Sequence, residues 1–278
     1  MKNEGGLRTK GYLKESLKGK PLITVVTVVY NGEKFIEETI LSVINQTYDN
    51  VEYIIMDGGS TDETINILKK YEEYIDYWVS EKDAGMYDAL HKGFKLGNGS
   101  IYSWINSDDI YEQGALKIVA DTFIKHKIDW LTAVPSVIDV NGNVISVEYP
   151  FYYHKHLIRN GLFRGDMLGF IQQESTFFSS KLYWKSPLNT SYKFAGDYHL
   201  WCGFANYSKL YTLKTTLAYF RIHNKQLSSD KEKYYQECDD LKINFLYKNL
   251  VKINSIKKMI KSILILSNKK MIRIDLTS

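Results

Sequence analysis

Residues 22–29 read Leu-Ile-Thr-Val-Val-Thr-Val-Val, an uninterrupted run of mostly β-branched and apolar side chains. A run without polar alternation is typical of a strand that is covered on both faces, as in a parallel sheet. Tyr30-Asn31-Gly32 ends the run, and residues 33–45 then repeat apolar side chains at a helical period. The sequence therefore predicts a buried strand followed by a helix.

The same alternation continues through residue 111. Residues 51–56, 77–80 and 101–105 are further predicted strands, and helical patterns lie in the two intervals between them. Strands that alternate with helices indicate right-handed βαβ units and a mostly parallel sheet. The predicted fold class is therefore α/β, with a central sheet flanked by helices.

The pattern is less regular after residue 111. Residues 130–140 predict one or two strands, and residues 139–143 form a hairpin turn before a strand at 144–147. Residues 172–180 are a further predicted strand, and a helix is expected from about residue 194.

Size and composition describe an ordinary globular protein. The chain has 278 residues, of which 44% are hydrophobic and 24% charged. Cys202 and Cys238 give neither a disulfide framework nor a zinc spacing, which fits a reducing compartment. Residues 1–20 are polar and basic without an apolar signal core, and no apolar run is long enough to span a bilayer. We therefore expect a cytoplasmic location.

Acidic side chains follow three of the predicted strands. Asp57 and Asp83 follow the second and third, and Asp108 and Asp109 follow the fourth. Parallel strands bring their carboxyl ends to one edge of a sheet, where ligands bind. Clustered carboxylates repel one another unless a cation neutralises them. Mg²⁺ or Mn²⁺ binds one or two carboxylates and keeps its other coordination positions for water and a diphosphate. Taken alone, each of these aspartates could instead stabilise a turn or act as a helix N-cap.

These motifs, in this order, resemble a family 2, GT-A-fold glycosyltransferase of bacterial surface-polysaccharide synthesis. The resemblance runs from about Pro21 to Ser229 and implies a Rossmann-like sheet. Its elements are the strand at residues 24–31 and the segments Asp57-Gly58-Gly59-Ser60-Thr61-Asp62, Ser80-Glu81-Lys82-Asp83-Ala84-Gly85-Met86-Tyr87-Asp88-Ala89, Asn106-Ser107-Asp108-Asp109, Gly196-Asp197-Tyr198-His199-Leu200-Trp201 and Arg221-Ile222-His223.

The resemblance implies a nucleotide-sugar donor site in the first half of the chain. Asp57 corresponds to a contact with the nucleotide base, Asp83 to a second nucleoside contact, and Gly85 to close backbone approach. Lys92 is a candidate for the diphosphate, although an ordinary solvated helix lysine explains it equally. The donor-binding residues implied are Thr27, Val29, Asn31, Asp57, Asp83, Gly85, Lys92, Asn106, Ser107 and Asp108.

The metal motif departs from the commonest Asp-x-Asp form, because Asn106 stands at its first position. The family pattern assigns the divalent cation, Mn²⁺ or Mg²⁺, to Asp108, and it suggests His223 as a metal or diphosphate contact. Asn106 retains hydrogen-bonding capacity without charge.

Asp197 is the candidate catalytic base, since an inverting transfer needs a carboxylate that removes the acceptor's hydroxyl proton. Many family members have Glu before this Asp, whereas this chain has Gly196. Asp197 also suits an N-cap of the helix that follows. Gln172, Gln173 and Glu174 are further candidates for acceptor or donor-sugar contacts.

Positive charge is concentrated at the end of the chain. Residues 242–278 carry nine Lys or Arg against Asp275 alone, a net +8, whereas the whole chain carries +4. Residues 1–241 are therefore net negative, and we do not expect a nucleic-acid-binding surface on them. Residues 253–266 predict a basic amphipathic helix, which suits either an anionic membrane surface or packing against protein. The acceptor implied by the resemblance is a glycan or a polyprenyl-diphosphate-linked saccharide, and the lipid-linked form would be presented at the inner membrane face.

The predicted organisation is an N-terminal extension (1–20), a GT-A catalytic domain (21–230) and a basic helical C-terminal extension (231–278). Within the domain, residues 21–112 form the nucleotide-binding half and residues 113–230 the acceptor-binding half. Two other interpretations remain. A sugar nucleotidyltransferase would bring a basic glycine-rich phosphate loop near its first strand, which Tyr30-Asn31-Gly32-Glu33 does not match. A non-catalytic nucleotide-sugar-binding subunit fits Asn106 but not the retained Asp108 and Asp197.

Overall fold

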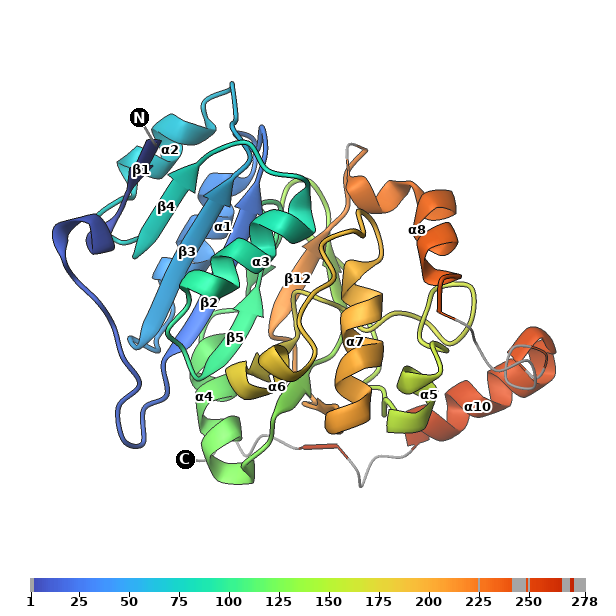
Figure 1. The fold of residues 1–278 in the computed structure, drawn as a ribbon. Coiled ribbons are helices and arrows are strands. Elements are labelled where there is room, and N and C mark those ends of the chain that lie inside the picture. Colours follow the sequence, from blue (N-terminus) through green and yellow to red (C-terminus); the bar gives the residue numbers. More distant parts are fainter. Residues whose placement is uncertain (1–2, 225, 242–248, 250, 267–270, 273–278) are drawn as a thin grey trace.

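The computed structural model describes residues 3–224, 226–241, 249, 251–266 and 271–272, and its main feature is a central sheet (Figure 1). Over these residues the sheet has eight strands in the order β1-β4-β3-β2-β5-β10-β7-β11. Their bounds are β1 Asn3–Gly5, β2 Ile23–Val29, β3 Val51–Asp57, β4 Tyr77–Ser80, β5 Ile101–Trp104, β7 Trp130–Thr132, β10 Phe177–Ser179 and β11 Tyr211–Thr212.

The register of the parallel strands aligns their carboxyl ends. β2, β3, β4 and β5 are mutually parallel neighbours, with Val29 opposite Asp57 and Asp57 opposite Ser80. The turns after these strands therefore leave the sheet at the same edge. This edge is where the acidic turns of the sequence were expected to meet.

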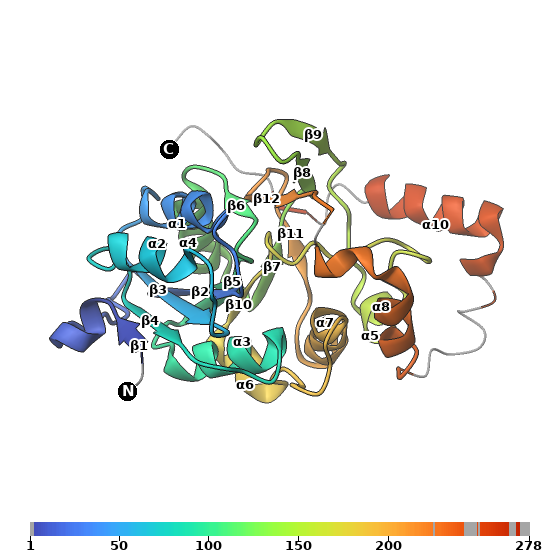
Figure 2. The ribbon, with the colours of Figure 1, turned by 90° about the horizontal axis from the view of Figure 1, so that it is seen from above.

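Helices cover both faces of the sheet, as Figures 1 and 2 show. α3 (Met86–Leu96), α6 (Ser180–Lys185) and α7 (Gly196–Tyr207) lie on one face, and α1 (Ile36–Ile44), α2 (Thr64–Lys70) and α4 (Ala115–His126) lie on the other. Alternate side chains of β2 enter the two cores, Val26 and Val28 on the α3 side and Val25 and Val29 on the α1 side. This two-sided burial explains the continuous apolar run.

A smaller sheet stands beside the first, with the strand order β6-β12-β8-β9. Its strands are β6 Ile110–Tyr111, β8 Ser136–Ile138, β9 Val144–Val147 and β12 Ala218–Arg221. β8 and β9 form the expected antiparallel hairpin. β12 pairs with both β6 and β8, so it brings residues near position 221 next to the turn after β5.

Two segments differ from the sequence expectation. Only Phe177–Ser179 of the predicted 172–180 strand is extended, and it runs antiparallel between β5 and β7. Residues 172–176 form the turn before it, and α6 begins at Ser180. In the N-terminal segment, β1 pairs with β4 and joins the edge of the large sheet.

The C-terminal segment contributes α8 (Lys231–Cys238) and α10 (Asn254–Leu266), and α5 (Lys155–Arg159) lies nearby (Figure 1). The expected basic helix is therefore present. Leu264 is buried in the core on the α3 side, while Ile253 and Met259 are 50% and 57% exposed. Part of its apolar surface packs on protein and part remains exposed. Lys242, Lys248, Lys269, Lys270 and Arg273 lie outside the described residues.

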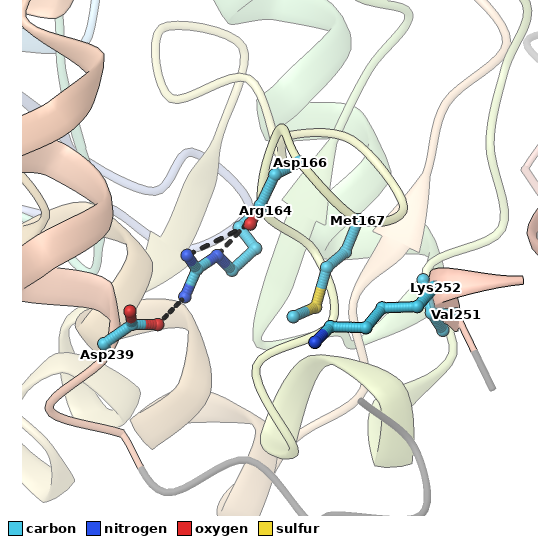
Figure 3. A pocket seen from close by; sticks show the side chains of 6 residues that line it. All are labelled: Arg164, Asp166, Met167, Asp239, Val251 and Lys252. Atoms are coloured by element: carbon cyan, nitrogen blue, oxygen red, sulfur yellow. Dashed lines mark hydrogen bonds and ion pairs between the residues drawn. The ribbon is translucent and has the colours of Figure 1, made fainter. Parts of the chain in front are cut away.

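A cavity of about 270 Å³ lies where the C-terminal segment meets the body (Figure 3). Buried Arg164 pairs there with Asp166 at 2.7 Å and with Asp239 at 2.6 Å. Two carboxylates compensate the buried guanidinium, so this contact fastens the segment to the loop at 164–169. The cavity is lined by Arg164, Asp166, Met167, Asp239, Val251 and Lys252, and none of these is a predicted site residue.

Candidate active site

The turn after β2 is tied to the turn after β3. Asn31 adopts a positive φ of 51°, and its backbone N–H donates to Ser60 Oγ at 2.7 Å. Its side-chain oxygen accepts the backbone N–H of Thr61 at 2.9 Å. These bonds fix the two turns side by side, with Asn31 between them.

Asp57 ends β3 and is 2% exposed. Its Oδ2 accepts the backbone N–H groups of Gly59 and Ser60 and the hydroxyl of Ser80 at 2.6 Å, and its Oδ1 accepts the Ser60 hydroxyl. The carboxylate therefore shapes the turn from within, as the turn-former interpretation expects.

The turn after β4 carries Asp83 and Gly85. Asp83 Oδ1 accepts the backbone N–H of Gly85 at 2.8 Å, and a Cβ added at Gly58 would lie 2.8 Å from Asp83 Oδ2. Asp83 therefore faces the turn that follows Asp57. Gly85 has a φ of 124° just before α3, a conformation that side-chain-bearing residues rarely adopt, and open space surrounds its Cα.

Three other predicted donor contacts have different surroundings. Thr27 is fully buried, and its Oγ1 lies 3.0 Å from the Tyr53 hydroxyl. Val29 is 5% exposed within the core on the α1 side. Lys92 forms an ion pair with Asp88 at 2.8 Å, and this hydrogen bond raises the lysine pKa. The structure thus gives Thr27 and Val29 packing roles and gives Lys92 a partner on its own helix.

The predicted metal residues meet across a long sequence separation. His223 Nε2 lies 2.9 Å from Asp108 Oδ2. Arg221, fully buried beside them, donates from Nε to the backbone oxygen of Asp108 at 2.7 Å and from its backbone N–H to Asp109 Oδ1 at 2.9 Å. Its guanidinium also pairs with Glu38 at 2.5 Å. Arg221 therefore fixes the Asp108-Asp109 turn against β12, a role that the sequence motif had not identified.

Asn106 and Ser107 complete this turn. Asn106 Nδ2 donates to Asp109 Oδ2 and to Gln173 Oε1, both at 3.1 Å. Its Oδ1 is buried and has no hydrogen-bond partner. Ser107 faces the turn after β2, since a Cβ at Gly32 would lie 3.4 Å from its Oγ. The turns after β2 and β5 therefore touch.

Asp109 lies behind Asp108 in the interior. It is fully buried, and burial together with the charges of Asp108 and Glu174 raises its pKa well above the ordinary value. The amide of Asn106 replaces the carboxylate of the commonest motif and donates to Asp109. A third carboxylate at position 106 would repel Asp109, so the amide suits this site.

Glu174 lies in the turn before β10 and is 3% exposed. Burial raises its pKa to about 7, and the nearby charges of Asp108 and Asp197 add to the increase. Its Oε1 is buried without a hydrogen-bond partner. Glu174 therefore lies near both Asp108, in the metal motif, and Asp197, the candidate base. The sequence had indicated it only as a contact of uncertain partner.

Gln172 and Gln173 serve the structure around Glu174. Gln172 Oε1 accepts the backbone N–H of Ser136 at 2.9 Å, and Gln172 Nε2 donates to the backbone oxygen of Ser136 at 2.8 Å. Gln173 donates to the backbone oxygen of Trp104 at 2.6 Å. Both side chains fasten the turn to its neighbouring strands.

Asp108 and His223 offer one carboxylate and one imidazole to a cation. Among the described residues, no group of three or more His, Cys, Asp or Glu side chains is arranged to hold a metal ion. Two protein ligands nevertheless suit Mn²⁺ or Mg²⁺ when substrate phosphates supply the others. The unpartnered Asn106 Oδ1 and Glu174 Oε1 leave acceptor capacity in this polar region. The residues present therefore fit the implied cation.

Asp197 lies in the first turn of α7, two positions after the cap residue Ala195. Burial raises its pKa to about 6, while hydrogen bonds from Tyr198 and Tyr87 partly oppose the increase. The Tyr87 hydroxyl donates to Asp197 Oδ1 at 3.3 Å. Gly196 packs under the Tyr87 ring, whose atoms would lie 2.7 Å from an added Cβ. The missing side chain at position 196 is thus what allows Tyr87 to reach Asp197.

Residues 24–189 match the family model described as Glycosyl transferase family 2. An uncharacterized glycosyltransferase of Rickettsia prowazekii is 31% identical over 234 residues, covering 82% of this chain and 72% of the relative. Chondroitin synthase of Escherichia coli is 32% identical over 149 residues, covering 51% of this chain and 21% of the synthase. These matches favour a glycosyltransferase over a nucleotidyltransferase.

Solved structures share the fold. S. aureus TarS, residues 1–349 in complex with UDP-GlcNAc, has a TM-score of 0.61 at 20% identity, covering 77% of this chain and 64% of the TarS chain. The mannosyltransferase PcManGT of Pyrobaculum calidifontis, in complex with GDP-Man and Mn²⁺, has a TM-score of 0.59 at 16% identity, covering 78% and 61%. The chain therefore belongs to glycosyltransferase family 2 and has the GT-A fold.

Proposed function

We propose that this protein transfers a sugar from a nucleoside-diphosphate sugar, of which a UDP-sugar is the first candidate, to a hydroxyl group of a glycan or a polyprenyl-diphosphate-linked saccharide. The transferred sugar is a hexose or an N-acetylhexosamine, and the pathway is synthesis of capsule, O-antigen or exopolysaccharide. Residues 21–112 bind the nucleotide and residues 113–230 the acceptor. TarS with UDP-GlcNAc and PcManGT with GDP-Man support a nucleotide-sugar donor.

The observation that carries the proposal is the position of Glu174. Its pKa is raised by burial and, to a lesser extent, by the charges of both Asp108 and Asp197, so the metal motif and the candidate base both lie near one buried carboxyl group. A transferase needs these two groups in one site, because the leaving diphosphate and the attacking hydroxyl act at the same sugar carbon.

Asp197 acts as the general base. The acceptor oxygen forms a bond to the anomeric carbon while the bond from that carbon to the diphosphate oxygen breaks, which inverts the configuration. The hydroxyl proton passes to Asp197, and the electron pair leaves with the nucleoside diphosphate. A pKa of about 6 leaves Asp197 ionised at neutral pH and more basic than an ordinary aspartate.

Asp108 and His223 would hold Mn²⁺ or Mg²⁺, which would supply positive charge to offset that of the departing diphosphate. Asp83, Gly85 and the turn at residues 57–60 lie along the nucleoside. Asn31 and Ser107, at the neighbouring turns, complete the donor side. The ligand pair and the turns come together at the carboxyl edge of β2–β5, which supports this placement.

We also propose that the protein acts at the inner face of the plasma membrane. Ile253 and Met259 are half exposed or more, and Lys252 and Lys258 are exposed beside them. Exposed apolar and basic side chains in one segment suit anionic lipid. None of the helices that the structure describes is long and apolar enough to cross a bilayer.

Measuring sugar transfer and donor binding separately tests the proposed role of Asp197. Purified protein with Mn²⁺ is incubated with UDP-GlcNAc or GDP-mannose and a lipid-linked or oligosaccharide acceptor, and sugar transfer is followed by mass spectrometry. Asp197→Asn is expected to lower kcat by about 10²–10⁴-fold and to bind donor normally. Asp121→Asn, an exposed aspartate on α4, is the control. Full transfer by Asp197→Asn would refute the assignment of the base.

A further inference from the structure

The cap residue of the helix that carries Asp197 has no side chain that can cap it. Its cap position is Ala195, which makes no side-chain cap hydrogen bond. The first turn of any helix leaves backbone N–H groups without intrahelical partners, and a buried helix end needs them satisfied. Asp197 itself accepts the backbone N–H of Tyr198 in the first turn, so what remains to be bound from elsewhere in the fold lies at and before the cap position.

Glu237 of α8 binds the backbone at the cap residue and at the two residues before it. Its Oε1 accepts the backbone N–H of Lys193 at 2.8 Å. Its Oε2 accepts the N–H groups of Phe194 at 2.8 Å and Ala195 at 2.7 Å. One carboxylate thus holds three consecutive backbone groups immediately before α7, where the helix dipole also favours a negative charge.

α7 in turn holds the end of α8. His199 Nε2 donates to the backbone oxygen of Glu237 at 2.8 Å, and its ring stacks on Tyr192 with centroids 3.9 Å apart. Contacts in both directions fix the last turn of α8 against the start of α7. Figures 1 and 2 both show α8 beside α7.

Glu237 also acts on the charge state of Asp197, because its negative charge contributes to the raised pKa of that aspartate. Tyr234, one turn earlier on α8, lies close enough that Asp197 raises its pKa as well. The titratable groups around Asp197 come from the turn before β10, α3, α7 and α8, and they are Glu174, Tyr87, Cys202, Tyr234, Glu237 and Cys238.

We propose that Glu237 is a positioning residue of the transferase, and that α8 is therefore a functional part of the acceptor side. By holding residues 193–195, Glu237 sets where the first turn of α7 begins and thus where the Asp197 carboxylate lies. This inference rests on the proposed role of Asp197 as general base. It moves the functional boundary of the site past residue 230, into the segment that the sequence marked as an extension.

The test is Glu237→Gln in the full-length chain. The substituted amide replaces one acceptor oxygen with an N–H₂ group, which faces at least one backbone N–H instead of accepting from it. We expect kcat to fall about 10- to 100-fold, the scale of a small misplacement of a reacting group, while donor affinity stays within about twofold. The acid limb of the kcat–pH profile should move to lower pH by about 0.5 unit, because a negative charge near Asp197 is lost.

Glu232→Gln is the matched control, since Glu232 lies on the same helix and is exposed. It should leave kcat, donor affinity and the pH profile unchanged. Donor affinity is measured by thermal shift with UDP-GlcNAc and with GDP-mannose in the presence of Mn²⁺. Glu237→Asp keeps the charge and should retain the wild-type acid limb with an intermediate kcat.

Two results would overturn the inference. One is a wild-type kcat and pH profile in Glu237→Gln. The other is an equal loss of donor affinity and kcat, which describes general structural damage. Asp197→Asn in the same assays separates this inference from the function on which it rests. If Asp197→Asn transfers sugar normally, the proposed base is wrong, whereas an inactive Asp197→Asn beside a normal Glu237→Gln refutes only the positioning role.

Discussion

The Nε2 atom of His223 lies 2.9 Å from the Oδ2 atom of Asp108, across a separation of 115 residues. The rings of His223 and Phe35 lie 5.1 Å apart, and the Arg221 guanidinium lies 4.7 Å from the centre of the same phenyl ring. Segments from α1, the turn after β5 and the end of β12 therefore meet at this pair. Because Arg221 also binds the Asp108 backbone, the pair is held before any ligand arrives.

Removing either member of this pair should weaken metal-dependent donor binding. Asp108→Asn and His223→Ala are each expected to reduce the thermal stabilisation by UDP-GlcNAc or GDP-mannose that depends on Mn²⁺. A tenfold weaker complex corresponds to about 1.4 kcal/mol less stabilisation at saturating ligand. Asp121→Asn on α4 is the control, because Asp121 is exposed and pairs only with Lys117 among the ion pairs of the described residues. An unchanged Mn²⁺-dependent shift in Asp108→Asn would contradict the metal assignment.

Activity should rise with pH as Asp197 loses its proton. A base with a pKa of about 6 is protonated below that pH and active above it, so kcat should increase through pH 6 and level off near pH 7. Tyr87→Phe removes a hydrogen bond that lowers the Asp197 pKa, and the acid limb should then move to higher pH. This direction is opposite to the one expected for Glu237→Gln. A limb that moves the same way in both variants would count against Asp197 as the titrating group.

Glu174 should make the metal-free protein less stable as pH rises. Its folded-state pKa is about 7, above the ordinary 4.5, so the folded protein holds a proton that the unfolded chain releases between these values. The free energy of unfolding should therefore fall as pH increases from about 4.5 to 7.5, by at most about 3 kcal/mol from this group. Glu174→Gln should flatten that dependence in urea titrations at a series of pH values. A stability that rises with pH equally in both proteins would exclude this effect.

The exposed side chains of the C-terminal segment should govern vesicle binding. Met259→Glu combined with Ile253→Glu is expected to lower recovery with phosphatidylglycerol vesicles in flotation, because both changes remove apolar surface and add repulsion. Ile124→Glu, an exposed apolar residue on α4, should leave recovery unchanged. Pure phosphatidylcholine vesicles should recover little of any variant. Equal recovery of the double variant and the wild type would favour protein packing as the role of this helix.

The structure of residues 21–112 was largely predictable from the sequence. The run at 22–29 and the turn at Asp57-Gly58-Gly59 carry local signals, namely two-sided apolar burial and glycine-containing turns, that act over a few residues. The expected strands at 51–56, 77–80 and 101–105 are present as β3, β4 and β5 within one residue at their ends. The predicted hairpin at 139–143 is present for the same reason.

The structure after residue 112 was predictable only in part. The 172–180 segment was predicted as one strand, yet only Phe177–Ser179 pairs with neighbours, and Gln172 and Gln173 bond to Ser136 and Trp104 across the fold. Nothing local to position 237 indicates that its carboxylate binds residues 193–195. Such contacts depend on which surfaces meet after the chain has folded.

The sequence by itself determined the α/β class, the order of the acidic turns and the identity of the residues at the carboxyl edge of the sheet. These follow from side-chain periodicity and turn chemistry, which operate between near neighbours in the chain. Only the tertiary structure decided that His223 faces Asp108, that Glu174 is buried near Asp108 and Asp197, and that Glu237 caps α7. Burial and approach between residues far apart in the chain set those pKa values and positions, and both arise only when the two halves pack together.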